Sequence, residues 1–174
     1  MKPADTAPSD ADQDALLPRD TRRSLPIALL RAREALMTQF RPMLAAHDLT
    51  EQQWRVIRVL GERGTLDASE VADRAFILAP SLTRIIRTLE ERGLILRERG
   101  ETDGRRVMLS LTQEGLRIIA EVAPESRQIY ASLEARFGAA WIADLLDRLE
   151  RLSEFNEGAG RPEGCRKYLR CRPK

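Results

Sequence analysis

Apolar residues recur at intervals of three and four along most of the chain, and this spacing predicts six amphipathic helices. The first five expected helices cover residues 25–46, 50–64, 67–75, 80–92 and 112–137. A sixth helix follows and carries Trp141, Leu145, Leu149 and Leu152. Each has one apolar face and one polar face. The pattern therefore predicts a largely helical protein in which these faces meet in a shared core.

Residues near the helix ends support these boundaries. Thr50 and Asp67 each open a capping box, a pattern in which side chains and backbone satisfy each other's hydrogen bonds at a helix start. We expect Pro80 at the first position of its helix, where a missing N–H group is not a loss. We expect Pro124 to interrupt the fifth helix, because proline removes a helical hydrogen bond.

Between the fourth and fifth helices the apolar period changes toward two, which predicts strands. Residues 95–99 and 107–111 are expected to pair as an antiparallel hairpin, with a turn at Asp103 and Gly104. The predicted order is ααααββαα, a mainly α fold with a small β-hairpin. Three short helices followed by a hairpin are the parts of a winged helix-turn-helix, whose third helix enters the major groove of DNA.

Composition divides the 174-residue chain into one folded unit and two tails. With 43% hydrophobic residues, the chain can bury one core. Residues 1–23 contain few large apolar side chains and residues 156–174 are basic, so we expect a disordered N-terminal tail and a flexible C-terminal tail around a domain at 24–155. No apolar run reaches the roughly 18 residues that span a bilayer, and the first residues lack a secretory signal. We expect a cytoplasmic protein with no membrane partner.

Histidine and cysteine content restricts the chemistry. His47 is the single histidine, so a site that needs two histidine ligands cannot form within one chain. Cys165 and Cys171 lie in the basic tail without a third cysteine or a histidine nearby, which disfavours structural zinc. We expect no enzyme activity, no metal and no cofactor. Reduced, exposed thiols are the simple interpretation of the two cysteines, and a redox-sensing pair is the alternative.

Basic residues point to nucleic acid through their placement. Three of the 29 basic residues are lysines and 26 are arginines, the side chain whose planar fork suits phosphates and guanine edges. The polar face of the helix at 80–92 has no acidic residue before Glu90. We predict that this face and the hairpin bind DNA through Ser81, Thr83, Arg84, Arg87, Thr88, Asp103, Arg105 and Arg106.

Four segments resemble one known family. The sequence DGRRVMLSLTQEG from Asp103 to Gly115 resembles the wing signature of the multiple antibiotic resistance regulator (MarR) family. The segments SLPIALLRARE from Ser24, LTEQQWR from Leu49 and APSLTRI from Ala79 resemble the branch that controls homoprotocatechuate degradation. Together they span roughly residues 24–155, and both tails lie outside the resemblance.

The resemblance implies a homodimer on a palindromic DNA operator. Helices at about 25–46 and 112–155 would form the dimer body, and residues 50–111 would form each winged lobe. Asp103 would pair with Arg105 and orient it toward DNA. The sequence agrees with a dimer, because those helices have more apolar surface than one small lobe can bury.

The resemblance also implies a phenolic acid effector, bound where the dimer body meets the lobe. Ser24, Arg31, His47, Trp54 and Arg55 offer cations for a carboxylate, an aromatic wall and polar groups. Each has a simpler interpretation. Trp54 has the spacing of a core residue, His47 lies near a helix end, and Arg31 and Arg55 have acidic neighbours in Glu34 and Glu51.

These observations predict a DNA-binding repressor of an aromatic-acid catabolic operon that a phenolic acid releases from its operator. Two alternatives remain open. One is a regulator of the same kind that senses oxidants through Cys165 and Cys171. The other is a structural helical dimer or protein-interaction module, which would show no salt-dependent binding to DNA.

Overall fold

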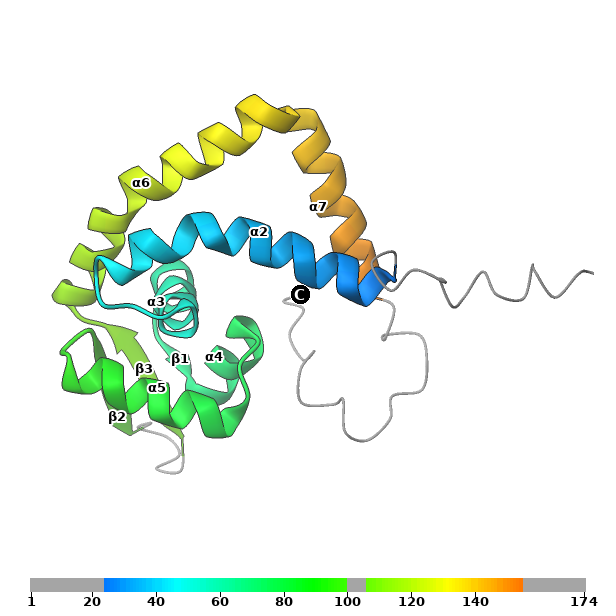
Figure 1. Cartoon of the computed structure of the whole chain (residues 1–174). Helices are drawn as coiled ribbons and strands as arrows, with labels where there is room; N and C mark the ends of the chain where they lie inside the picture. The colour runs from blue at the N-terminus through cyan, green and yellow to red at the C-terminus, as the bar shows by residue number, and fades with distance from the viewer. Residues whose placement is uncertain (1–23, 100–105, 155–174) are drawn as a thin grey trace, which may run out of the picture. The chain divides into compact units, whose positions relative to one another are not determined.

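The computed structural model describes residues 24–99 and 106–154 (Figure 1). The expected tails at 1–23 and 156–174 lie outside these ranges, as do Asp103, Arg105 and both cysteines. The chain forms two compact units, one up to Gln39 and one from Phe40 onward. Most of helix α2 (Leu25–Ala45) belongs to the first unit. Its exposed apolar side chains there are Leu25, Leu29, Leu30 and Leu36.

The second unit contains the predicted winged helix-turn-helix. It comprises α3 (Glu51–Arg63), β1 (Leu66–Asp67), α4 (Ala68–Ala75), α5 (Ala79–Glu91), β2 (Ile95–Arg99), β3 (Val107–Leu111), α6 (Gln113–Phe137) and α7 (Ala139–Ser153). Figure 1 shows α3, α4 and α5 beside the small sheet. The fold class predicted from sequence is confirmed. No helix in the described ranges is long and apolar enough to cross a membrane.

Both predicted capping boxes form. At the start of α3, Gln53 N–H donates to Thr50 Oγ1 at 3.2 Å, and Thr50 N–H donates to Gln53 Oε1 at 2.9 Å. Asp67 and Glu70 make the reciprocal pair at the start of α4. The sequence therefore defines the entry into both helices.

Three expectations about the elements are corrected. The sequence order omits β1, which pairs with β3 and makes an antiparallel sheet of order β1-β3-β2. Pro124 does not interrupt the fifth helix, because α6 continues through it to Phe137. A helix loses one hydrogen bond at a proline, and the other backbone bonds of this 25-residue helix keep it continuous. Helix α5 begins one residue early, at Ala79, so Pro80 occupies its second position.

The core of the second unit lies between the three helices of the lobe, the sheet and the first half of α6. Its most buried side chains come from every one of these elements: Val56, Ile57, Leu60, Val71, Leu89, Ile95, Leu109 and Val122. Met43 and Leu44, at the end of α2, belong to the same cluster. Burial of this kind contributes about 1.5–3 kcal/mol per large side chain, so the cluster fixes the position of α5 on the lobe.

The junction between the sheet and α6 depends on a close backbone approach. Thr112 Oγ1 donates to Gly93 O at 2.7 Å and accepts from Gly115 N–H at 3.0 Å. A Cβ atom on Gly115 would clash with the backbone oxygen of Leu94, so this position accepts only glycine without a backbone shift. The threonine and glycine at the end of the wing signature thus join the wing to α6.

Candidate nucleic-acid interface

Helix α5 separates its apolar and polar residues between two faces. Leu82, Ile85, Ile86 and Leu89 are buried in the core. On the other side Thr83, Arg84 and Arg87 are exposed, and Ser81 and Thr88 are half-buried. The apolar face thus fixes the helix to the lobe. The polar face is accessible, as it must be in a helix that enters a DNA groove.

The two threonines on this face bond to their own helix. Thr83 Oγ1 donates to Ala79 O at 3.1 Å, and Thr88 Oγ1 donates to Arg84 O at 3.1 Å. Each hydroxyl keeps acceptor capacity for a donor on DNA. These bonds favour one side-chain rotamer for each threonine.

The two predicted arginines of α5 differ in their surroundings. Arg87 Nε donates to Glu91 Oε1 at 2.8 Å, and this hydrogen bond raises the pKa of Arg87. The Arg84 guanidinium makes no hydrogen bond or ion pair with any residue in the described ranges. The Arg84 guanidinium is therefore available to a ligand, whereas Arg87 would first have to give up its carboxylate partner.

The wing contributes one predicted residue that the structure describes. Arg106 is 67% exposed, and its guanidinium lies 3.7 Å from Asp67 Oδ2, at the start of α4. Asp103 and Arg105 lie outside the described residues, so their pairing remains a prediction. On the neighbouring strand, Arg97 is also exposed. Sequence analysis did not single out Arg97, because a lone arginine on a strand carries no distinctive pattern.

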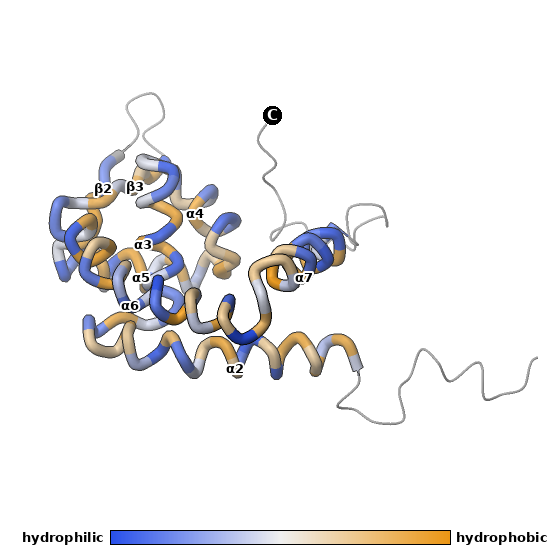
Figure 2. Tube along the Cα trace, turned by 90° about the horizontal axis from the view of Figure 1, so that it is seen from above, coloured by the Kyte–Doolittle hydropathy of each residue, from blue (hydrophilic) through white to orange (hydrophobic). Residues whose placement is uncertain are grey.

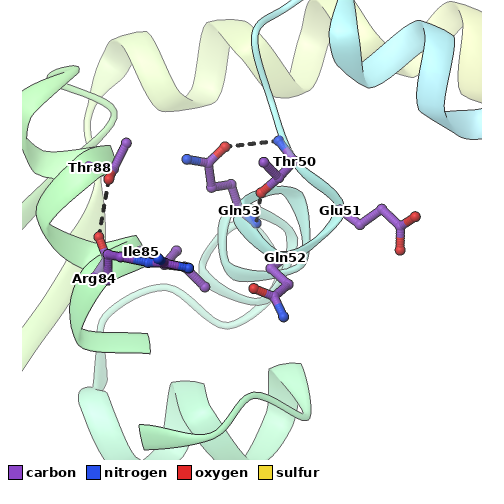
Figure 3. A pocket seen from close by; sticks show the side chains of 7 residues that line it. All are labelled: Thr50, Glu51, Gln52, Gln53, Arg84, Ile85 and Thr88. Atoms are coloured by element: carbon purple, nitrogen blue, oxygen red, sulfur yellow. Dashed lines mark hydrogen bonds between the residues drawn. The ribbon is translucent and has the colours of Figure 1, made fainter. Parts of the chain in front are cut away.

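A recess of about 460 Å³ lies between the start of α3 and the middle of α5. Its lining residues, shown in Figure 3, are Thr50, Glu51, Gln52, Gln53, Arg84, Ile85 and Thr88. Arg84 and Ile85 extend from α5 toward the side chains of α3 (Figure 3). Sequence analysis identified Thr50 and Gln53 only as a helix cap, because the proximity of α3 to α5 is not visible in the sequence. A molecule in this recess would share Arg84 with DNA bound to α5.

The five predicted effector residues divide between the two units. Ser24 and Arg31 belong to the first unit, and His47, Trp54 and Arg55 belong to the second. Their convergence on one site therefore remains a prediction. None of the five lines the recess between α3 and α5.

The three residues in the second unit have structural partners. Trp54 is half-buried and packs against the core. His47 Nδ1 lies 3.6 Å from Glu121 Oε2 on α6, and its backbone carbonyl accepts a bond from Arg92 at 2.9 Å. Arg55 Nη1 donates to Ala75 O at 2.8 Å, at the end of α4. A ligand that uses Arg55 would compete with this carbonyl.

The described residues contain no cluster of three or more His, Cys, Asp or Glu side chains that could hold a metal ion. The polar groups on α5 and the wing are instead hydrogen-bond donors and cations, which suit base edges and phosphates. The geometry therefore agrees with recognition of DNA.

Comparisons with known proteins give the same result. The MarR family model matches residues 47–106. The transcriptional regulator FarR of Neisseria gonorrhoeae is 45% identical, over 77% of this chain and 92% of its own. The homoprotocatechuate degradative operon repressor of Escherichia coli is 44% identical, over 73% of this chain and 86% of its own.

A solved structure shows the same fold. The crystal structure of NadR in complex with 4-hydroxyphenylacetate matches with a TM-score of 0.70 and 44% identity, over 79% of this chain and 97% of that one. The relatives are transcriptional regulators, which confirms the expectation that the chain is not an enzyme. The winged helix-turn-helix, the cationic face of α5 and these similarities establish that the chain belongs to the MarR family.

Proposed function

We propose that this protein is a homodimeric repressor of an aromatic-acid catabolic operon, released from its operator by a phenolic acid. The observation that carries the proposal is the 44% identity with the Escherichia coli homoprotocatechuate degradative operon repressor, over 86% of that protein. The structure of the similar protein NadR with 4-hydroxyphenylacetate supports the choice of ligand class.

DNA recognition starts from α5. Arg84 has the geometry for a guanine edge or a phosphate, and Ser81 and Thr83 lie near the helix start, where a recognition helix meets base edges. Arg106 and the residues at the hairpin tip, Asp103 and Arg105, would contact the adjacent groove or its phosphates. The threonine and arginine side chains thereby supply both base contacts and charge.

Two copies of the chain give two such lobes. Helix α7 has no buried residue, and Trp141, Leu145, Leu146 and Leu149 are exposed along it. Hydrophobic positions recur along α7 in Figure 2. An apolar face of this length favours association with a second copy, and a two-fold dimer matches a palindromic operator.

The effector acts by differential binding. A phenolic acid releases DNA only if it binds the DNA-free arrangement of the lobes better than the DNA-bound one. Arg31 and Arg55 supply cations for the carboxylate, Trp54 supplies an aromatic surface, and Ser24 and His47 supply polar contacts. A coupling of about 1–3 kcal/mol corresponds to roughly 5- to 150-fold weaker DNA binding.

Fluorescence anisotropy tests the proposal. A labelled duplex from upstream of the protein's own gene is titrated with protein, beside a scrambled duplex of equal composition. Each titration is repeated with 4-hydroxyphenylacetate, with 3,4-dihydroxyphenylacetate and with unsubstituted phenylacetate. We expect preference for the upstream duplex and weaker binding in the presence of a hydroxylated acid. Preference that ignores all three acids would reject the effector, and binding without preference or salt dependence would reject the regulator.

A further inference from the structure

Two residues in the turn between α4 and α5 are poorly suited to their local positions. Phe76 ends α4 in the left-handed conformation, with φ 51° and ψ 51°. Glycine or asparagine is usual there, because a Cβ atom is strained at positive φ. Leu78 occupies the position that caps α5 and makes no side-chain cap bond. Serine, threonine, aspartate and asparagine are preferred at that position.

The same two side chains are exposed. Phe76 is 61% exposed and Leu78 is 49% exposed, whereas Ile77 between them is 5% exposed. Ile77 therefore anchors the turn in the core, and its two neighbours extend a large aromatic and a large aliphatic group into solvent. Folding of the lobe does not explain either choice, because neither side chain is buried.

The turn itself is held firmly. Phe76 N–H donates to Asp73 O at 3.3 Å, and Ile77 N–H donates to Ala72 O at 3.0 Å, which closes the end of α4. Arg55 donates from α3 to Ala75 O at 2.8 Å. Strain at an ordered position is a feature of functional sites, where the surrounding structure maintains it.

The turn is continuous with the candidate DNA interface. It leads directly into α5 (Figure 1), and the N-terminal residues of a recognition helix lie closest to the base edges. In the major groove, the thymine methyl group is the apolar feature of the base edges, and apolar side chains recognise it. Two exposed apolar side chains at this end of α5 match that chemistry.

We infer that Phe76, supported by Leu78, reads thymine methyl groups in the operator. The inference rests on the proposed DNA-binding function and adds a specificity-determining contact to it. The apolar contact would discriminate thymine from cytosine near the position read by Ser81 and Arg84.

The test uses the full-length protein and the upstream duplex that it prefers. Each thymine is replaced in turn by deoxyuridine, which removes only the methyl group. Binding is measured for the wild type, for Phe76→Gly and for Leu116→Ala, a matched loss of an exposed apolar side chain on α6. Glycine relieves the positive φ, so Phe76→Gly should unfold at the same or higher urea concentration than the wild type.

We expect one or two deoxyuridine positions to weaken wild-type binding about three- to tenfold, the effect of losing roughly one buried methyl contact. Phe76→Gly should bind the unmodified duplex more weakly by a similar factor and should no longer respond at those positions. Leu116→Ala should respond as the wild type does.

Other outcomes overturn the inference in different ways. If the wild type prefers the upstream duplex and no deoxyuridine changes its affinity, DNA binding stands and methyl reading is wrong. Methyl reading is also wrong if Phe76→Gly keeps the full deoxyuridine response. It is wrong as well if Phe76→Gly weakens binding to scrambled DNA as much as binding to the upstream duplex, because that pattern indicates a contact with the DNA backbone. A wild type without preference for any duplex rejects both this inference and the proposed function.

Discussion

Arg84 and Arg87 lie one helical turn apart on the exposed face of α5, yet their surroundings differ. Arg87 is paired with Glu91 at 2.8 Å, and the Arg84 guanidinium has no hydrogen bond or ion pair with any described residue. Sequence analysis placed both arginines on this face correctly but treated them as equivalent. The sequence analysis named only Glu90 after the cationic stretch, and the structure shows that Glu91, four residues after Arg87, pairs with it.

Replacing Arg84 tests its role in base recognition. We expect Arg84→Ala to reduce the difference in binding free energy between the operator and a scrambled duplex by about 1–3 kcal/mol, because a guanine contact is lost. Arg58→Ala on α3 removes the same charge from an exposed residue outside the candidate DNA interface and should weaken both duplexes alike, or neither. Anisotropy titrations at fixed salt measure both differences. Unchanged discrimination in Arg84→Ala would remove Arg84 from base recognition.

Arg55 has two competing interpretations that a stability measurement separates. Its bond to Ala75 O connects α3 to the end of α4, so Arg55→Met should lower the free energy of unfolding by about 1.5–3 kcal/mol. Arg58→Met is the control, because Arg58 is exposed and pairs with Glu62 at i, i+4, a pair of small value. Urea unfolding measures both variants. Unchanged stability of Arg55→Met with weakened binding of 4-hydroxyphenylacetate would favour an effector contact alone.

At the scale of elements, local sequence patterns predicted where helices and strands begin and end better than which elements lie beside each other. The capping boxes at Thr50 and Asp67 and both strands of the hairpin formed where the sequence placed them. Strand β1 was missed because Leu66 and Asp67 are too few residues to show a period of two. The recess between α3 and α5 was missed for another reason: it joins side chains more than 30 residues apart, and no local pattern encodes that distance.

Gly115 provides the sharpest test of the junction between sheet and helix. We expect Gly115→Ala to lower the free energy of unfolding by about 3 kcal/mol, because the new Cβ atom meets the carbonyl oxygen of Leu94 and the backbone must move. Gly61→Ala is the matched control. Its Cβ atom would clash with Ile119 Cδ1 at 2.6 Å and touch Leu111 Cδ1 at 3.5 Å, both flexible ends of side chains, and alanine favours a helix. Equal stability of the two variants in urea would contradict the close approach at Gly115.

At the scale of the whole molecule, the exposed apolar residues of α7 support the proposed dimer. Its leucines follow helical spacing, as the sequence predicted, and none is buried within one chain. Along the same helix, Arg148 Nε donates to Asp144 Oδ2 at 2.6 Å, and this bond lowers the pKa of Asp144. The apolar side of α7 is therefore the surface on which a second copy gains most.

A charge on this surface should separate the dimer. We expect Leu149→Arg to convert a dimer into monomers at micromolar concentration and to weaken operator binding, because a buried unpaired charge is costly. Asp147→Arg introduces the same side chain two residues away, on the other side of α7, and should leave the dimer intact. Light scattering after gel filtration measures both masses. A Leu149→Arg dimer as stable as the wild type would exclude this part of α7 from the interface.

The central claim is that an aromatic acid and DNA compete through two arrangements of one protein. Calorimetric titration of 4-hydroxyphenylacetate into the free protein, and then into the operator-bound protein, tests it most directly. Linkage requires that DNA weaken acid binding by the same factor by which the acid weakens DNA binding, and we expect a factor of roughly 5 to 150. Equal affinity of the acid for free and operator-bound protein would contradict the account, because such a ligand could not release the repressor.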